Sequence, residues 1–287
     1  MKDSARYWLD PDLEGLECLT ATYYSHRFAP HAHEEFVIGV IQSGAQRVRL
    51  RGSHEIFPEN TTCVINPEEV HTGHAATGAG WSYKVIYPHP SVLARVTEEL
   101  GERSARTPYF TRNVYKDNYI SRLFLNLHEA LESAYATPLA KQTLLNSTLA
   151  RFILRYGSEK PKLKTGKKNT PGISRAREYL DAFYDTPVTL DELAEVACMS
   201  QFHFVRSFSS QTGIPPHVYQ LCRRIGAAKQ LLCTDMPLVD IAAETGFVDQ
   251  SHFTNRFKAV VGVTPGQFRK LSKNLQDKRS QHGIESS

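Results

Sequence analysis

The chain has 287 residues, and its 34 Lys and Arg against 30 Asp and Glu give a formal net charge of +4. This length suits two domains of ordinary size, and so small a charge does not by itself indicate nucleic acid as a partner. No apolar run reaches the length of a membrane span, no basic-then-apolar leader opens the chain, and the five cysteines form no CxxC pair, so we expect a reduced, cytoplasmic protein without a membrane partner.

The first hundred residues contain short β-prone runs that are punctuated by Gly, Pro and Asn. Apolar and β-branched residues gather at 36–41, 46–51, 62–65 and 81–87. Short strands at this spacing predict a small antiparallel barrel or double-sheet roll.

Histidines lie close together in this β-rich part. His31, His33 and Glu35 alternate along an extended run and can share one face, and His71 could complete a set of nitrogen and oxygen ligands. The alternatives are a bound metal, the polar lining of an effector pocket, or structural histidines. The pocket lining is favoured, because Glu35 follows His33 so closely that it fits a pocket wall better than a three-ligand metal face.

Aromatic residues extend this candidate pocket. Trp81 and Tyr83 alternate along one predicted strand, and Gln42 lies at the end of a neighbouring one. An aromatic wall with His and Gln groups suits a small polar metabolite such as a sugar, an amino acid or an organic acid, although aromatics at period two are also ordinary core residues. The candidate effector-binding residues are His33, Glu35, Gln42, His71, Trp81 and Tyr83.

Two helices and a linker are expected next. Leucines at four-residue spacing run from Leu123 to Leu131, and Pro138 suits the start of a second helix that reaches Tyr156. Residues 158–172 hold five Lys together with Pro and Gly and lack apolar periodicity, which predicts a flexible linker.

The C-terminal third contains one pattern twice. The segment 190–208 recurs at 238–257, with an offset of 48 before a short turn and 49 after it. Gly213 and Gly262 follow at matching positions and suit the ends of helices. Each copy is predicted to form a helix-turn-helix, and a plain helical bundle is the alternative.

Capping residues support both copies. Thr189 and Glu192 form a capping box before the first copy, and Ser200 and Asp249 suit N-caps of the second helix of each copy. The helix expected at 217–232 between the copies would be about 25 Å long. This length is compatible with recognition helices about 34 Å apart in adjacent major grooves.

These residues carry a specific resemblance. The run from Gly246 to Phe253 and the segment Gly262-Val-Thr-Pro265 are similar to the signature of the AraC/XylS family of bacterial transcriptional regulators. The segments HAHEE and NPEEVH, which contain the histidines, resemble the cupin-type effector domain at the N-terminus of many members. Catalytic cupins place a carboxylate beyond the second His, where this chain has Val37 and Ile38. In this family, helices after the barrel often pair two subunits, and packing onto the barrel alone is the alternative.

The resemblance also implies which residues contact DNA. Asn255 stands where the family often has Arg, and an Asn favours adenine through a bidentate pair. Carried over by position, the base-reading residues are Gln201, Phe202, Val205 and Arg206 in the first copy and Gln250, Ser251 and Asn255 in the second. The candidate phosphate contacts are Arg175, Arg223, Arg224, Lys258, Arg269 and Lys270.

The sequence thus predicts a multi-domain α+β protein. A cupin-like antiparallel β-barrel with a helix pair occupies 1–157, a linker 158–172, an all-α double helix-turn-helix domain 173–272 and a disordered tail 273–287. We expect a DNA-binding transcriptional regulator rather than an enzyme, without cofactor or metal. Its expected partners are double-stranded operator DNA, a small polar effector, a second subunit and, as a further candidate, RNA polymerase. The alternatives are a metal-dependent cupin enzyme with a regulatory DNA-binding domain, and a constitutive DNA binder whose barrel only dimerises.

Overall fold

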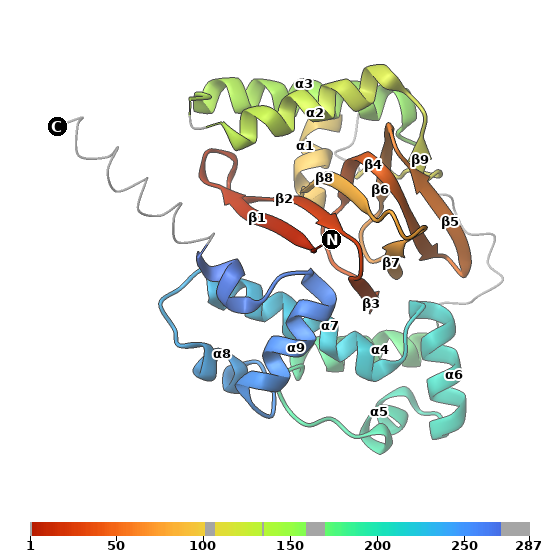
Figure 1. The fold of residues 1–287 in the computed structure, drawn as a ribbon. Coiled ribbons are helices and arrows are strands. Elements are labelled where there is room, and N and C mark those ends of the chain that lie inside the picture. Colours follow the sequence, from red (N-terminus) through yellow and green to blue (C-terminus); the bar gives the residue numbers. More distant parts are fainter. Residues whose placement is uncertain (1, 101–106, 134, 159–169, 271–287) are drawn as a thin grey trace.

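A β-rich half is followed by a helical half in the computed structural model (Figure 1). The described residues are 2–100, 107–133, 135–158 and 170–270, so the expected tail and most of the expected linker lie outside them. The strands are β1 (Ser4–Asp10), β2 (Leu16–Tyr23), β3 (Arg27–His31), β4 (Val37–Leu50), β5 (Ser53–Pro58), β6 (Thr61–Ile65), β7 (His71–Ala75), β8 (Trp81–Tyr87) and β9 (Val114–Tyr115). The helices of this half are the 3-10 turn η1 (Pro11–Leu13), α1 (Pro90–Glu99), α2 (Asn118–Glu132) and α3 (Pro138–Tyr156).

The long strand β4 organises an antiparallel barrel. The two runs expected at 36–41 and 46–51 form this one strand, whose first half pairs with β6 and β8 and whose second half pairs with β5 and β7. Between the halves, Gly44 has a φ of +69°, and a Cβ there would lie 2.2 Å from the Gly80 carbonyl oxygen. Only glycine fits this close approach, which lets the strand bend from one sheet into the other.

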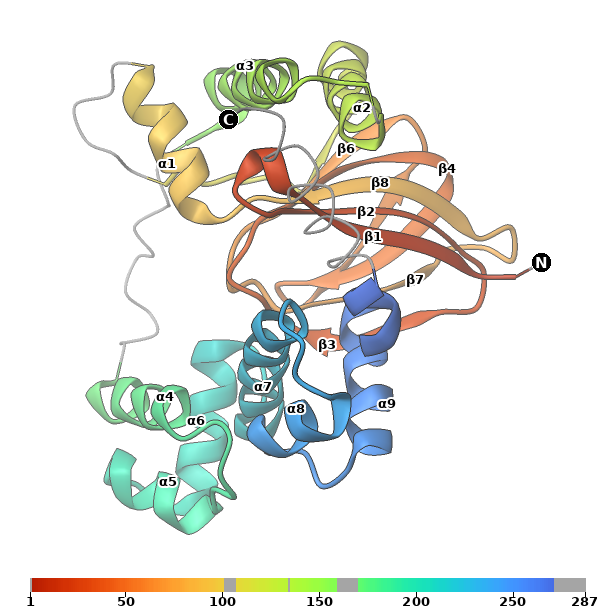
Figure 2. The same cartoon turned by 90° about the vertical axis from the view of Figure 1, so that its left-hand side faces the viewer.

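The barrel has helices on two opposite sides. Helices α1, α2 and α3 cover one side, and the C-terminal helices lie against the other (Figure 2). Leu127, Leu149 and Phe152 are fully buried where the helix pair meets the sheet. The predicted helix pair is therefore confirmed, and its leucine stripe packs on the barrel.

The C-terminal half contains both predicted helix-turn-helix units. Its helices are α4 (Pro171–Ala182), α5 (Leu190–Ala197), α6 (Gln201–Thr212), α7 (Pro216–Leu232), α8 (Leu238–Glu244) and α9 (Gln250–Val261). Helices α5 and α6 form the first unit, α8 and α9 form the second, and α7 joins them. The predicted capping box of Thr189 and Glu192 is present, and Ser200 and Asp249 each accept a hydrogen bond from the backbone of the helix that follows.

The second unit shares its hydrophobic core with the barrel. Phe253, Phe257 and Phe268 belong to the same buried cluster as the barrel interior, and the rings of Tyr7 and Phe268 lie 4.7 Å apart. The first unit has a cluster of its own around Phe204 and Phe208. The C-terminal half thus closes one end of the barrel.

Among the described helices, none has the length and apolar character that spanning a membrane requires.

Candidate functional site

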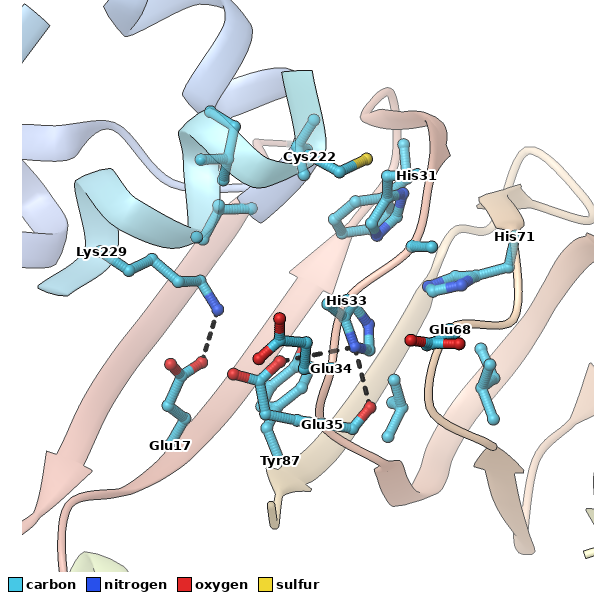
Figure 3. Close-up of a pocket in the computed structure, with 18 of the residues that line it drawn as sticks. Glu17, His31, His33, Glu34, Glu35, Glu68, His71, Tyr87, Cys222 and Lys229 are labelled. Atoms are coloured by element: carbon cyan, nitrogen blue, oxygen red, sulfur yellow. Dashed lines mark hydrogen bonds and ion pairs between the residues drawn. The ribbon is translucent and has the colours of Figure 1, made fainter. Parts of the chain in front are cut away.

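A cavity of about 490 Å³ lies where α7 meets the barrel. The barrel contributes aromatic, histidine and carboxylate side chains to its wall, and α7 contributes Cys222, Ile225 and Lys229. Figure 3 shows these side chains converging from the two halves of the chain. A site built in this way changes whenever the helical half moves relative to the barrel.

Three histidines form a compact group in the cavity. One ring nitrogen of each of His31, His33 and His71 lies within 4.8 Å of those of the other two. The ring centroids of His31 and His71 are 4.2 Å apart, and those of His33 and His71 are 5.1 Å apart. Extended backbone before β4 places His31 and His33 on one face, and β7 supplies His71 beside them because it pairs with β3. The structure therefore brings these three sequence candidates together.

Backbone carbonyls fix the orientation of all three rings. The Nδ1 atom of His31 lies 2.7 Å from the Ala29 oxygen, that of His33 lies 2.9 Å from the Glu35 oxygen, and that of His71 lies 2.8 Å from the Glu69 oxygen. A carbonyl oxygen can only accept, so each Nδ1 carries a hydrogen and donates it. Each neutral ring therefore keeps its lone pair on Nε2.

Burial keeps the three rings neutral. Loss of solvent and then the neighbouring His71 hold the pKa of His31 and of His33 well below the ordinary value of 6.5. Burial also lowers the pKa of His71, although the Glu69 carbonyl opposes this shift. At neutral pH all three imidazoles are therefore acceptors at Nε2.

An ion pair crosses the cavity between the two halves of the chain. The Lys229 Nζ on α7 lies 2.7 Å from the Glu17 Oε2 on β2, and the two side chains are 17% and 15% exposed. Burial works against the charged lysine, but Glu17 and Glu35 outweigh it and raise the pKa of Lys229 above its ordinary value. Lys229 therefore stays charged at neutral pH and ties the helical half to the barrel.

Further contacts hold this arrangement around the cavity. Arg223 on α7 forms an ion pair with Glu34, and Arg177 on α4 lies 3.4 Å from Glu68. The half-exposed positions of these pairs give each only a small free energy. The docking of the two halves therefore depends mainly on the shared hydrophobic core and on the Lys229 contact.

Four of the six candidate effector residues lie in the cavity, and two do not. His33, Glu35, His71 and Tyr83 line the cavity. Gln42 is exposed at a shift of the pairing register of β4 between Ile41 and Ser43, which turns it away from the interior. Trp81 is 1% exposed and packs in the barrel core against Tyr23, with ring centroids 5.3 Å apart. This corrects the expectation for Gln42 and Trp81, neither of which lines the cavity.

Lys229 and Glu17 are site residues that the sequence patterns did not single out. Lys229 lies four residues after Ile225 and three before Leu232, both of them buried on α7. A lysine on the buried stripe of a predicted helix was the available signal, because a charged group there needs a partner. Glu17 gave no comparable signal, since β2 was not expected.

The candidate base-reading residues lie on α6 and α9. Gln250, Ser251 and Asn255 of α9 are exposed, as are Gln201 and Arg206 of α6. The candidates on α6 differ from one another in the contacts that they make. The Gln201 side chain is hydrogen-bonded to Asp191, Val205 packs against the core of the first unit, and the side chain of Phe202 lies outside the described residues.

The six candidate phosphate contacts divide into two groups. Arg175, Lys258 and Lys270 are exposed, although Arg175 also donates a hydrogen bond to the Val196 carbonyl. The other three make contacts within the protein, and a role for them on DNA stays a prediction. Arg223 pairs with acidic residues, Arg269 donates to the Met236 carbonyl, and Arg224 donates to backbone carbonyls.

Arg224 joins the two helix-turn-helix units. From α7 its guanidinium donates to the Tyr184 oxygen at 2.6 Å and the Thr186 oxygen at 3.0 Å, both ahead of the first unit. It also donates to the carbonyl of Gly246 in the turn of the second unit. Gly246 has a φ of +75°, and a Cβ there would lie 2.0 Å from the Asp185 oxygen, so the two units touch at this glycine.

Comparisons with known proteins agree with this architecture. The family model of an AraC-like ligand binding domain matches residues 14–149, and that of a helix-turn-helix domain matches residues 193–271. The uncharacterized HTH-type transcriptional regulator YbfI of Bacillus subtilis (strain 168) is 31% identical over 244 residues, which cover 85% of this chain and 87% of YbfI. The arabinose operon regulatory protein of Salmonella typhimurium is 27% identical over 262 residues, which cover 89% and 91% of the two chains.

A solved structure has the same two-part arrangement. Apo ToxT from Vibrio cholerae strain SCE256 superposes with a TM-score of 0.57 over 94% of this chain and 98% of its own. The two sequences are 9% identical, so the likeness concerns the fold.

Proposed function

The chain belongs to the AraC family of transcriptional regulators, and from this premise we propose that a small polar effector binds in the cavity between barrel and α7 and sets how the two helix-turn-helix units engage DNA. The relatives named above are regulators, so we assign the cavity no catalytic role. The observation that carries the proposal is the ion pair between Lys229 and Glu17, because it links the helix between the DNA-reading units to the ligand-binding domain.

The mechanism that we propose is a shift between two arrangements. An effector that contacts Lys229 or Glu17 changes the free energy of docking α7 on the barrel. Because α7 joins both units, each docking arrangement favours its own placement of α6 and α9. A ligand that binds one arrangement more tightly then raises its population.

The lining of the cavity favours a polar effector. His33 and His71 present acceptors, Tyr83 and Tyr87 present hydroxyls, and Lys229 suits a carboxylate. These groups converge in a cavity whose wall also contains apolar side chains such as Val37, Ile65 and Ile225, and such a combination is usual in a small-molecule site. We therefore propose a sugar, an amino acid or an organic acid.

The test compares two ion pairs of similar burial. The DNA that the full-length protein retains from a mixture is identified by sequencing. The affinity of the protein for this DNA is then measured by fluorescence anisotropy with and without polar metabolites. We expect an effector to change this affinity by about 5–150-fold in the wild type and by much less in Lys229→Met. The control is Lys84→Met, because Lys84 pairs with Glu132 at the same 2.7 Å but within the N-terminal half.

Two results would refute the proposal. An unchanged effector response in Lys229→Met would show that the ion pair does not carry the coupling. A panel of sugars, amino acids and organic acids that leaves the affinity and the melting temperature unaltered would favour the constitutive DNA binder instead.

We propose a homodimer that forms through the outer face of the helix pair. Leu139 and Leu154 on α3 are 73% and 70% exposed, and Tyr119 on α2 is 53% exposed. Between the two leucines the exposed residues are Gln142, Thr143, Asn146 and Arg151, of which Arg151 alone is charged. An exposed stripe of this kind suits contact with the same stripe on a second copy.

Light scattering after gel filtration tests the dimer. We expect the wild type to elute with twice the chain mass and Leu139→Glu/Leu154→Glu to elute with the mass of one chain. Val239→Glu is the control, since Val239 is 56% exposed but lies on α8. A wild type that remains monomeric at micromolar concentration would contradict this proposal.

RNA polymerase stays a proposed partner, because a regulator acts on transcription through it.

A further inference from the structure

We propose that His31, His33 and His71 bind a divalent transition-metal ion of the zinc type in the cavity. One ring nitrogen of each histidine lies within 4.8 Å of the other two, so a single ion could contact all three. Imidazole nitrogen is a preferred ligand of such ions. This site goes beyond the proposed effector response and does not depend on it.

The hydrogen bonds of the rings support a metal site. All three Nδ1 atoms donate to backbone carbonyls, at 2.7, 2.9 and 2.8 Å for His31, His33 and His71. Histidines that bind metals are typically held in this way, with one nitrogen donating to a carbonyl or carboxylate and the other directed at the ion.

The lone pairs on Nε2 are available to a metal ion. Within the described part of the chain, the three rings receive no hydrogen bond at Nε2 from a protein donor. Three acceptors grouped at one cavity wall can bind a single cation together. A metal ion satisfies all three at once.

Glu35 has a supporting position rather than a ligand position. Its Oε2 lies 3.7 Å from the Nδ1 of His33, on the side of the ring that faces away from Nε2. The sequence-based preference for a metal-free pocket rested on Glu35 as a badly spaced third ligand. His71 takes that place from another strand, so the spacing of Glu35 no longer counts against a metal.

The charges around the cavity are mixed. Among its described lining residues, carboxylates are supplied by Glu17, Glu34, Glu35 and Glu68, and cationic groups by Arg177, Arg223 and Lys229. The ion pairs of Lys229 with Glu17 and of Arg223 with Glu34 neutralise much of the positive charge. A divalent cation at the histidines is therefore not opposed by an uncompensated cation.

A three-histidine site leaves coordination positions open. In zinc sites of this kind, water or a ligand oxygen takes the fourth position. The open side here belongs to the cavity that α7 also lines. An effector with a carboxylate or hydroxyl oxygen could therefore bind the ion and contact the helical half together.

The first test measures binding of Co²⁺ alone to tag-free, full-length protein. We expect one Co²⁺ per chain with visible absorption bands, displaced by Zn²⁺. His31→Gln, His33→Gln and His71→Gln should each weaken binding by about 100-fold or more, since losing even a supporting hydrogen bond of a ligand costs about 10–100-fold. His74→Gln is the control, because His74 lies on the same strand as His71 but outside the group.

The second test needs no variant. X-ray absorption of the zinc-loaded wild type should give three imidazole nitrogens at about 2.0–2.1 Å. Substoichiometric binding, fewer than three imidazoles, or unchanged Co²⁺ affinity in folded His-to-Gln variants would each overturn the proposal. Metal binding without any effect of metabolites on DNA affinity would refute the proposed function and leave the metal site standing. A metabolite effect on DNA affinity in a protein that binds no metal would refute the metal site and leave the proposed function standing.

Discussion

Replacing Arg224 with Ala is expected to lower the free energy of unfolding of the helical half by about 2–4 kcal/mol, because three charge-assisted hydrogen bonds to backbone carbonyls are lost together. The guanidinium spans Tyr184, Thr186 and Gly246, which belong to the connections of both units. The carbonyls of Tyr184 and Gly246 are left without this donor next to the tight contact at Gly246. Thermal and urea unfolding, followed by circular dichroism, measure the loss.

The same substitution should affect DNA binding unevenly. Two units held by one helix bind an operator with both half-sites more tightly than either unit binds alone. Arg224→Ala loosens their relative placement, so affinity for the full operator should fall while affinity for a single half-site changes little.

Two variants test the reason for this effect. In Arg224→Lys the compact ammonium cannot reach three carbonyls, so it should recover only part of the stability. Arg223→Ala removes a neighbouring positive charge on the same helix, which pairs with half-exposed acids, and should cost at most about 1 kcal/mol. Equal losses for Arg223→Ala and Arg224→Ala would show that charge, and not the bonding to carbonyls, is responsible.

The helical half was largely predictable from sequence, because its determinants are local. Capping side chains such as Ser200 and Asp249 mark helix starts within a few residues of chain, and the paired phenylalanines mark the buried face. The barrel was predictable only in outline. The strands β1 and β2 have no flanking turn signal as clear as those of the later strands, and β2 pairs with β8, whose partner residues lie 58–70 positions away along the chain.

The candidate site was harder to predict, since it depends on contacts between the two halves. The sequence pointed to His31, His33 and His71, because histidines are rare enough for their grouping to be visible. Nothing local pointed to the pairing of Lys229 with Glu17, which are 212 residues apart. A barrel core continuous with that of the second unit was equally invisible, because periodicity reports which face is buried and not what covers it.

Arg206→Ala is expected to cost about 1–3 kcal/mol of binding free energy on the specific operator, which is about 5–150-fold in affinity. Arg206 is exposed on α6, whereas Phe204 and Phe208 of the same helix are fully buried. A guanidinium on the outward face of a recognition helix can donate two hydrogen bonds to a guanine edge. The substitution should therefore also relax the preference for one base pair.

The equivalent residue of the second unit gives an internal comparison. Asn255 lies 49 positions after Arg206 and is exposed at the matching place on α9. Asn255→Ala should relax specificity in the other half-site, where we expect a preference for adenine to be lost. The loss of affinity should be smaller than for Arg206→Ala because the Asn amide is uncharged. Both effects are measured by anisotropy on operators in which one base pair at a time is changed.

A phosphate contact would behave differently, and Lys258 provides the reference. It is exposed on α9, and its replacement by Ala should weaken binding to operator and random DNA alike. The slope of log affinity against log salt concentration should fall in magnitude by about one, because one phosphate contact is lost. If Arg206→Ala shows this uniform loss instead of altered base preference, Arg206 contacts the backbone and does not read a base. A loss confined to the operator, with random DNA bound as before, identifies α6 as a base-reading helix, because only base contacts distinguish one sequence from another.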